Sequence, residues 1–99
     1  MLDRMKLEDF HACLGQAFTV RLEDGQTIGM VLKEANPLGT FNPAVQKRQA
    51  FSLIFRGPPQ PVLPQMIYPM ANDSLGPLDL FIVPVGPDAQ GLCYEAVLT

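Results

Sequence analysis

LGPLDLFIVPVGP, at residues 75–87, is the strongest strand signal in the sequence, because an apolar run lies between two Gly-Pro breakers. Successive side chains of a strand point to opposite faces. The two faces of this run carry Leu78, Leu80 and Ile82 on one side, and Asp79, Phe81, Val83 and Val85 on the other. Both faces are mostly apolar, so we expect both to be covered, by the rest of a barrel, by the N-terminal segment or by a partner chain. Pro84 cannot donate a ladder hydrogen bond, so it should lie near the strand end or beside an edge.

The segments on either side of this run also read as strands. Residues 92–98 follow it after a turn at 86–91, and the short connection favours an antiparallel hairpin over residues 78–98. Upstream, residues 66–70 form a short strand that leads into the run through a turn. The C-terminal half of the chain is therefore expected to be a sheet.

Nearer the N-terminus the pattern predicts three more strands and a helix. Residues 49–56 form a strand, and the prolines of residues 57–65 make a stiff connector after it. Residues 18–35 form a hairpin around Asp24-Gly25, a favoured hairpin dipeptide. A short helix is expected over residues 6–15, where it would plug an open end of the sheet with one apolar face, made of Leu7, Phe10 and Leu14.

Together these elements predict a mainly β chain, with one domain spanning residues 1–99. About six short strands joined by turns are typical of a small antiparallel barrel or sandwich, here with one short N-terminal helix. A chain of 99 residues supports a single core of modest size, so association into a dimer or a larger assembly would help its stability.

Charge and composition narrow the classes of partner. The net charge is −3 and no basic stripe is present, so nucleic-acid binding is not expected. No run is long and apolar enough for a membrane helix, and the charged start Met1-Leu2-Asp3-Arg4 is not a secretory signal, so we expect a cytoplasmic protein with no membrane partner. Cys13 and Cys93 are expected to be reduced core residues.

A search for reactive clusters predicts no catalytic, metal or cofactor site. His11 is the only histidine, and it lacks the partners of a zinc or nucleophile site. Ser52 and Ser74 lie outside any G-x-S-x-G elbow, and no glycine-rich phosphate loop occurs. One pair of carboxylates, Asp79 and Glu95, falls on neighbouring strands and would be the candidate for acid–base chemistry.

The function expected first is a non-enzymatic protein-interaction or structural module that binds a protein partner or itself. Its candidate contact residues lie on the central run and on the Pro-rich connector, which contains P-x-x-P spacings: Phe81, Val83, Val85, Pro58, Pro59 and Pro61. Two alternatives stay open. One is a small barrel that binds an apolar ligand in a cavity lined by Phe51, Phe55, Phe81 and Tyr94. The other is a small enzyme that uses Asp79 and Glu95.

Three stretches in this order also support a family resemblance: residues 51–58, residues 75–88 and Tyr94-Glu95-Ala96-Val97. With the helix pattern at the N-terminus, they make the chain resemble a family of small bacterial proteins known only as a domain of unknown function. The resemblance implies companions of phage-tail-collar-like proteins and offers no catalytic residues. Where that family has a His-Pro in the turn before the central strand, this chain has Ala71-Asn72-Asp73.

Overall fold

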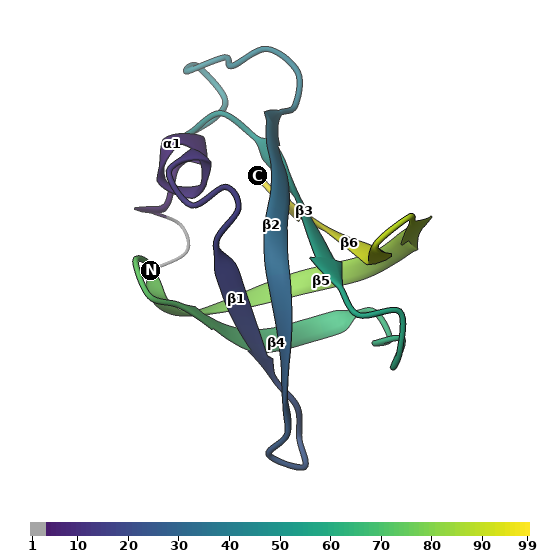
Figure 1. The fold of residues 1–99 in the computed structure, drawn as a ribbon. Coiled ribbons are helices and arrows are strands. Elements are labelled where there is room, and N and C mark those ends of the chain that lie inside the picture. The colour runs from purple at the N-terminus through teal and green to yellow at the C-terminus, as the bar shows by residue number, and fades with distance from the viewer. Residues whose placement is uncertain (1–3) are drawn as a thin grey trace.

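The structure is a computed structural model that describes residues 4–99, and these residues form a six-stranded antiparallel barrel with one short helix (Figure 1). The elements along the chain are α1 (Leu7–His11), β1 (Ala17–Arg21), β2 (Thr27–Pro37), β3 (Phe51–Gly57), β4 (Met66–Asn72), β5 (Gly76–Asp88) and β6 (Gly91–Leu98). Around the barrel the order is β1-β2-β3-β6-β5-β4, and β4 closes the ring against β1. The mainly β prediction is confirmed, in its barrel form.

β5 is the longest strand, with 13 residues, and it serves two neighbours in turn. Its first half, Gly76–Ile82, pairs with β4, and its second half begins to pair with β6 at Val83. The register with β6 shifts between Pro84 and Gly86, where the strand bulges. Gly86 has a φ of 129°, which a glycine adopts without strain. The bend that lets one strand change neighbours is therefore built on a glycine.

The barrel interior is filled by alternate side chains from every strand, as the period of two requires. From β5 the inward side chains are Leu78, Leu80 and Ile82, as the alternation predicts. Phe18 of β1 and Phe55 of β3 meet edge to face across the interior, with ring centroids 5.1 Å apart. This geometry is one that aromatic pairs favour in cores.

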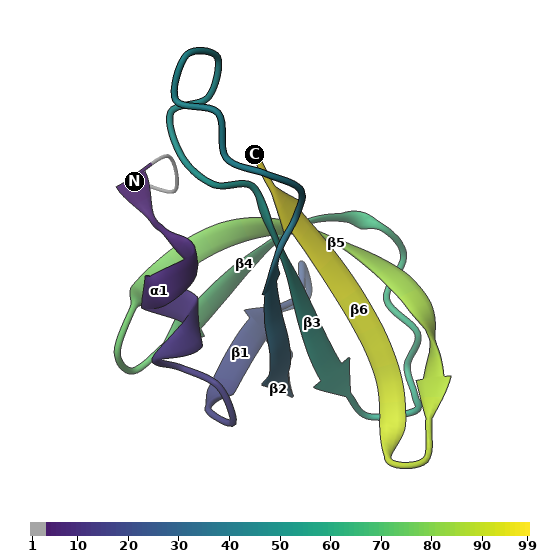
Figure 2. The same ribbon diagram turned by 90° about the horizontal axis from the view of Figure 1, so that it is seen from above.

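Each end of the barrel is covered by a segment outside the strands (Figure 2). At one end α1 inserts Phe10, which is fully buried and lies 5.6 Å from the ring of Phe51. At the other end the Pro-rich connector inserts Leu63, whose backbone N–H donates a 2.9 Å hydrogen bond to the Tyr94 hydroxyl. The buried position of Phe10 agrees with the prediction that the helix covers an open end of the sheet.

Several predicted boundaries need correction. The helix expected over residues 6–15 ends at His11, because the chain turns away so that the Gly15 N–H can donate to Leu32 of β2. The strand expected over 49–56 runs from Phe51 to Gly57, and the strand expected over 66–70 continues to Asn72.

The hairpin expected over residues 78–98 begins two residues earlier, at Gly76. The turn expected at 86–91 is much tighter, since β5 continues to Asp88 and β6 begins at Gly91. The Asp88 side chain accepts the backbone N–H groups of Gln90 and Gly91, so two residues suffice for the reversal.

Of the covers predicted for the central run, the rest of the barrel and the N-terminal segment do not cover its outer face within the described residues, and cover by a partner chain stays a prediction. Phe81 and Val85 are 50% and 53% exposed on the outer face. No second layer of the described residues packs against the apolar outer face of β5. Pro84 lies in the half of β5 that pairs only with β6. Because β4 does not pair with this half, the missing N–H of Pro84 breaks no hydrogen bond to β4.

Candidate functional site

Three large apolar side chains gather on the outside of the barrel, and we call them the outer patch: Ile67 of β4, Phe81 of β5 and Val97 of β6. They are 62%, 50% and 54% exposed, respectively. Ile67 and Phe81 are direct partners in the β4–β5 ladder. Cross-strand partners hold their side chains about 4.5–5.5 Å apart at Cβ, so the two form one surface.

The outer patch surrounds a hollow that opens where β5 and β6 part. Their pairing stops at Val83 and Glu95, and Figure 1 shows the two strands diverging from their shared turn. The hollow has a volume of about 310 Å³. Its lining comes from the outer patch and from four residues beside it: Asp79, Leu80, Ala96 and Leu98. An apolar depression thus separates two strands on an otherwise closed barrel.

Carboxylates flank the outer patch. Asp79 precedes Phe81 by two residues on the same face of β5, and Glu95 precedes Val97 in the same way on β6. Glu95 accepts a 2.6 Å hydrogen bond from the Ser52 hydroxyl. Within residues 4–99, Asp79 makes no side-chain hydrogen bond or ion pair. The apolar centre therefore has an acidic rim, of which Asp79 is the unengaged part.

The charge of the whole chain is divided unevenly. Residues 57–99 contain no Lys, Arg or His, and they carry four carboxylates: Asp73, Asp79, Asp88 and Glu95. This half therefore has a formal charge of −4, whereas residues 1–56 carry +1, which together give the −3 of the chain. β4, β5 and β6 all lie in the acidic half. No cation of these three strands offsets the acidic rim of the outer patch.

The carboxylate pair considered for catalysis is not brought together. Glu95 pairs with Val83, and Asp79 lies four residues before Val83 on β5. Strands rise about 3.3 Å per residue, so the two carboxylates are separated by roughly 13 Å along the strand. A joint acid–base role for Asp79 and Glu95 is not supported by this geometry.

The aromatic residues considered for a ligand cavity also do not share one space. Phe51, Phe55 and Tyr94 are buried in the barrel, and Phe51 and Phe55 pack against other core rings. Phe81 points to the outside instead. Its side chain belongs to the outer patch, so the four residues do not line one pocket.

The remaining predicted contact residues are dispersed. Val83 is half-buried and Val85 is exposed farther along β5, next to the bulge. In the connector Pro59 and Pro61 are exposed, whereas Pro58 is half-buried. The Pro61–Pro64 spacing contains the buried Leu63, so this P-x-x-P segment is fixed to the barrel as its cover.

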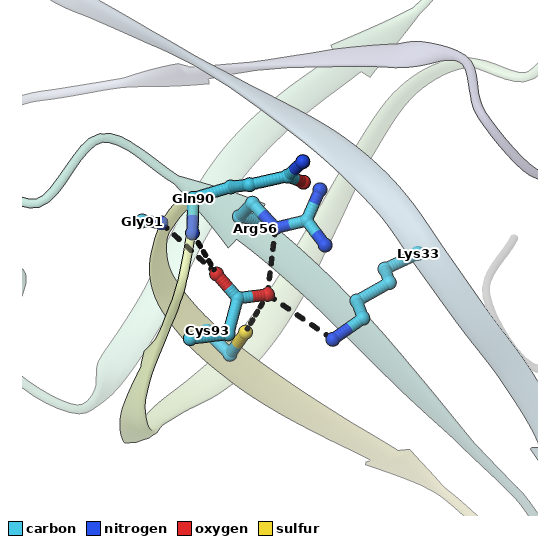
Figure 3. Close-up of polar contacts among 6 residues, drawn as sticks. Lys33, Arg56, Gln90, Gly91 and Cys93 are labelled. Atoms are coloured by element: carbon cyan, nitrogen blue, oxygen red, sulfur yellow. Dashed lines mark hydrogen bonds and ion pairs between the residues drawn. The ribbon is translucent and has the colours of Figure 1, made fainter.

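A polar cluster centred on Asp88 ties the β5–β6 turn to the neighbouring strands (Figure 3). One carboxylate oxygen accepts the N–H groups of Gln90 and Gly91 at 2.8 and 2.9 Å. The other accepts the Arg56 Nε–H at 2.8 Å and the Lys33 Nζ–H at 3.1 Å. The Cys93 thiol also donates to this second oxygen, with a sulfur–oxygen distance of 3.6 Å.

These bonds define the chemistry of the cluster. The Gln90 N–H, followed by the Arg56 guanidinium, holds the pKa of Asp88 well below its usual range. Burial, and then the charge of Asp88, raises the pKa of the Cys93 thiol, so the thiolate that a nucleophile needs is disfavoured. Asp88 was not among the site residues predicted from the sequence. The available signal was its position three residues before Gly91, where an Asp side chain can close a turn.

The other polar residues considered from the sequence have structural partners. His11 is exposed, and its Nε2 donates a 3.0 Å hydrogen bond to the Ala35 carbonyl oxygen. Cys13 and Cys93 are free thiols, and both are buried. Among the described residues no three His, Cys, Asp or Glu side chains are grouped as metal ligands would be, and no helix has the length and hydrophobicity needed to cross a membrane.

The turn in which this chain departs from the family resemblance is organised by Asn72. Its buried amide nitrogen donates to the Gln16 side chain and to the Ala17 carbonyl oxygen, at 3.1 and 3.0 Å. Its Oδ1 accepts the N–H groups of Ser74 and Leu75. Asn72 therefore closes the β4–β5 turn and joins it to the start of β1.

No curated protein and no solved structure matches this chain. A family model does match, over residues 5–98, which is nearly the whole length described above. Helix, barrel, outer patch and Asp88 cluster all lie within those bounds. The chain therefore belongs to the family described as Domain of unknown function (DUF6916).

Proposed function

We propose that this chain is a non-enzymatic interaction module that binds another protein, or a second copy of itself, through the outer patch. The observation that carries the proposal is the exposure of Ile67, Phe81 and Val97 together on three strands of one sheet. Exposed apolar surface that is rimmed by polar residues marks interaction sites on soluble proteins. Aromatic residues at the centre of such a surface are frequent hot spots of binding.

The state of the reactive side chains supports a non-enzymatic role. Asp88 is engaged by four hydrogen-bond donors besides the Cys93 thiol, and Glu95 is engaged by Ser52. Burial raises the pKa values of the Cys13 and Cys93 thiols. These groups stabilise the barrel wall and do not converge on the hollow of the outer patch.

The outer patch alone would support weak binding. Fully burying a Phe, Ile or Val side chain contributes about 1.5–3 kcal/mol, and about half of each side chain remains to be buried here. The three residues together would therefore contribute roughly 2–5 kcal/mol of favourable free energy. Since micromolar affinity requires about 8 kcal/mol, the rim must add polar contacts.

Site-specific photo-crosslinking in the native cells tests the proposal. A benzophenone amino acid replaces Phe81 in one variant and Phe41 in a control, because Phe41 is similarly exposed but lies in the loop between β2 and β3. We expect a crosslinked adduct from position 81 and none from position 41. The partner in the adduct is then purified, and Phe81→Ala is expected to weaken its binding at least about tenfold, which corresponds to about 1.4 kcal/mol.

Two results would contradict this function. The first is an adduct from position 41 alone, which would place the binding surface on the loop. The second is the absence of an adduct from position 81 together with a monomeric chain in sedimentation at micromolar concentration. The family resemblance gives one class of assembly in which to search for the partner, namely phage-tail-like assemblies.

A further inference from the structure

We infer that the outer patch binds a protein segment in which a large apolar side chain is flanked by Lys or Arg. This inference rests on the proposed interaction function and specifies the chemistry of the partner. Its observations are the apolar hollow between β5 and β6, the acidic rim of the outer patch and the absence of cations in residues 57–99.

The hollow sets the size of the apolar anchor. Its volume of about 310 Å³ is at the lower limit of the range of small-molecule pockets, which is about 300–1,000 Å³. Its apolar lining consists of Ile67, Leu80, Phe81, Ala96, Val97 and Leu98, and Asp79 is its one charged lining residue. Such a space suits one Leu, Phe or Met side chain and not a large cofactor.

The rim sets the charge of the flanking residues. Asp79 lines the hollow and has no ion-pair partner within the described residues. Glu95 lies on the same face of β6 as Val97, and only a neutral hydroxyl engages it among residues 4–99. A partner cation on one side of the anchor would meet Asp79, and a second cation on the other side would meet Glu95. Complementary potentials of this kind select partners and speed their encounter.

The same charges argue against a two-fold dimer through this face. In a symmetric dimer each surface meets its own copy. The acidic rims of the two copies would then be opposed, and like charges in contact across an interface oppose association. The occupant is therefore a different protein with basic residues beside its anchor.

Two synthetic peptides test the inference on the whole chain: acetyl-Lys-Leu-Phe-Lys-amide, and the same peptide with Glu in place of Lys. Binding is followed through the backbone amide signals of the isotope-labelled protein in NMR spectra. We expect the Lys peptide to bind at least about fivefold more tightly at low salt, with shifts centred on Ile67, Phe81 and Val97. This preference should shrink at 0.5 M salt, where the Debye length falls to several ångströms.

Matched variants identify the carboxylate responsible. Asp79→Asn is expected to weaken binding of the Lys peptide about two- to fivefold, whereas Glu23→Gln, an equal charge change in the exposed β1–β2 turn, should leave it unchanged. If Asp79→Asn does not fold, the comparison of the Lys and Glu peptides on the unmodified chain tests whether the partner is basic.

Equal affinity for the two peptides, a preference for the Glu peptide, or shifts centred elsewhere would overturn the inference. So would the absence of binding by both peptides at millimolar concentration, or a symmetric dimer through the outer patch. If any of these results accompanies a crosslink from position 81, the interaction function stands and only the stated partner chemistry is wrong. If position 81 also gives no crosslink and the chain is monomeric in sedimentation, both proposals fail.

Discussion

Asp88 shows how one side chain can determine the end of a strand. It closes a two-residue turn through backbone N–H groups and at the same time binds Arg56 and Lys33, which come from β3 and β2. Lys33 lies at the irregularity in the β2–β3 register, between Leu32 and Glu34. The bulge therefore places the Lys33 side chain where it can pair with Asp88 of the β5–β6 hairpin.

We predict that Asp88 makes stability depend on pH. Its folded-state pKa is lowered, so its stabilisation is complete above the unfolded value of about 3.9 and is lost as the pH falls below that value. Asp88→Asn should therefore lower the urea midpoint at pH 7, and the difference from the unmodified chain should narrow at pH 3. Urea unfolding at the two pH values measures this.

Asp79→Asn is the control, since Asp79 has no ion-pair partner among the described residues and should show no comparable difference. An equal loss of midpoint for Asp88→Asn at both pH values would contradict the ionic role of Asp88.

At the scale of elements, the β5–β6 hairpin depends on a close approach at its turn. A Cβ added to Gly91 would overlap the carbonyl oxygen of Gly57, at the end of β3. Gly29 of β2 is a matched position, because a Cβ there would meet nothing within 4 Å. Gly91 is therefore required because a Cβ there would overlap the backbone, whereas a Cβ at Gly29 would meet no other atom within 4 Å.

We therefore expect Gly91→Ala to destabilise the barrel by about 1–3 kcal/mol, the usual cost of overpacking a well-packed site. Gly29→Ala should change the free energy of unfolding by less than about 0.5 kcal/mol. Chemical denaturation of both variants gives the comparison. Similar values for the two variants would show that the turn can shift to accommodate the methyl group.

The sequence was a good guide to elements whose pattern is local. The alternation that placed Leu78, Leu80 and Ile82 inward is confirmed, and so is the Asp24-Gly25 turn between β1 and β2. It was a poor guide where the structure depends on which other segments pack against an element. The helix ends early because Gly15 pairs with Leu32, and the hydrophobic outer face of β5 is exposed although its composition predicts cover. Of the outer patch only Phe81 was predicted from the sequence, because grouping it with Ile67 and Val97 requires the register of three strands.

At the scale of the whole molecule, the barrel is held closed from both ends. Phe10 seals one end from a helix of five residues, and Leu63 seals the other from an irregular connector. An isolated helix of this length is unstable in water, so α1 forms because Phe10 is buried against Phe51. The helix and the barrel therefore depend on each other.

Phe10→Ala should reduce the free energy of unfolding by about 3–5 kcal/mol, which is the cost of emptying a buried aromatic site. Phe41→Ala, at an exposed loop position, should reduce it by less than about 0.5 kcal/mol. Thermal and urea unfolding of the two variants measure the difference. A small effect for Phe10→Ala would mean that the barrel closes without its helix.

The uneven division of charge has a practical consequence for handling the molecule. Trypsin cleaves after Lys and Arg, and the last of these is Arg56, so the acidic half is released as one long peptide, residues 57–99. All three lysines, Lys6, Lys33 and Lys47, lie in the other half. Chemical attachment through side-chain amines would therefore anchor the protein to a sensor chip by its N-terminal half and leave β4, β5 and β6 free of modification.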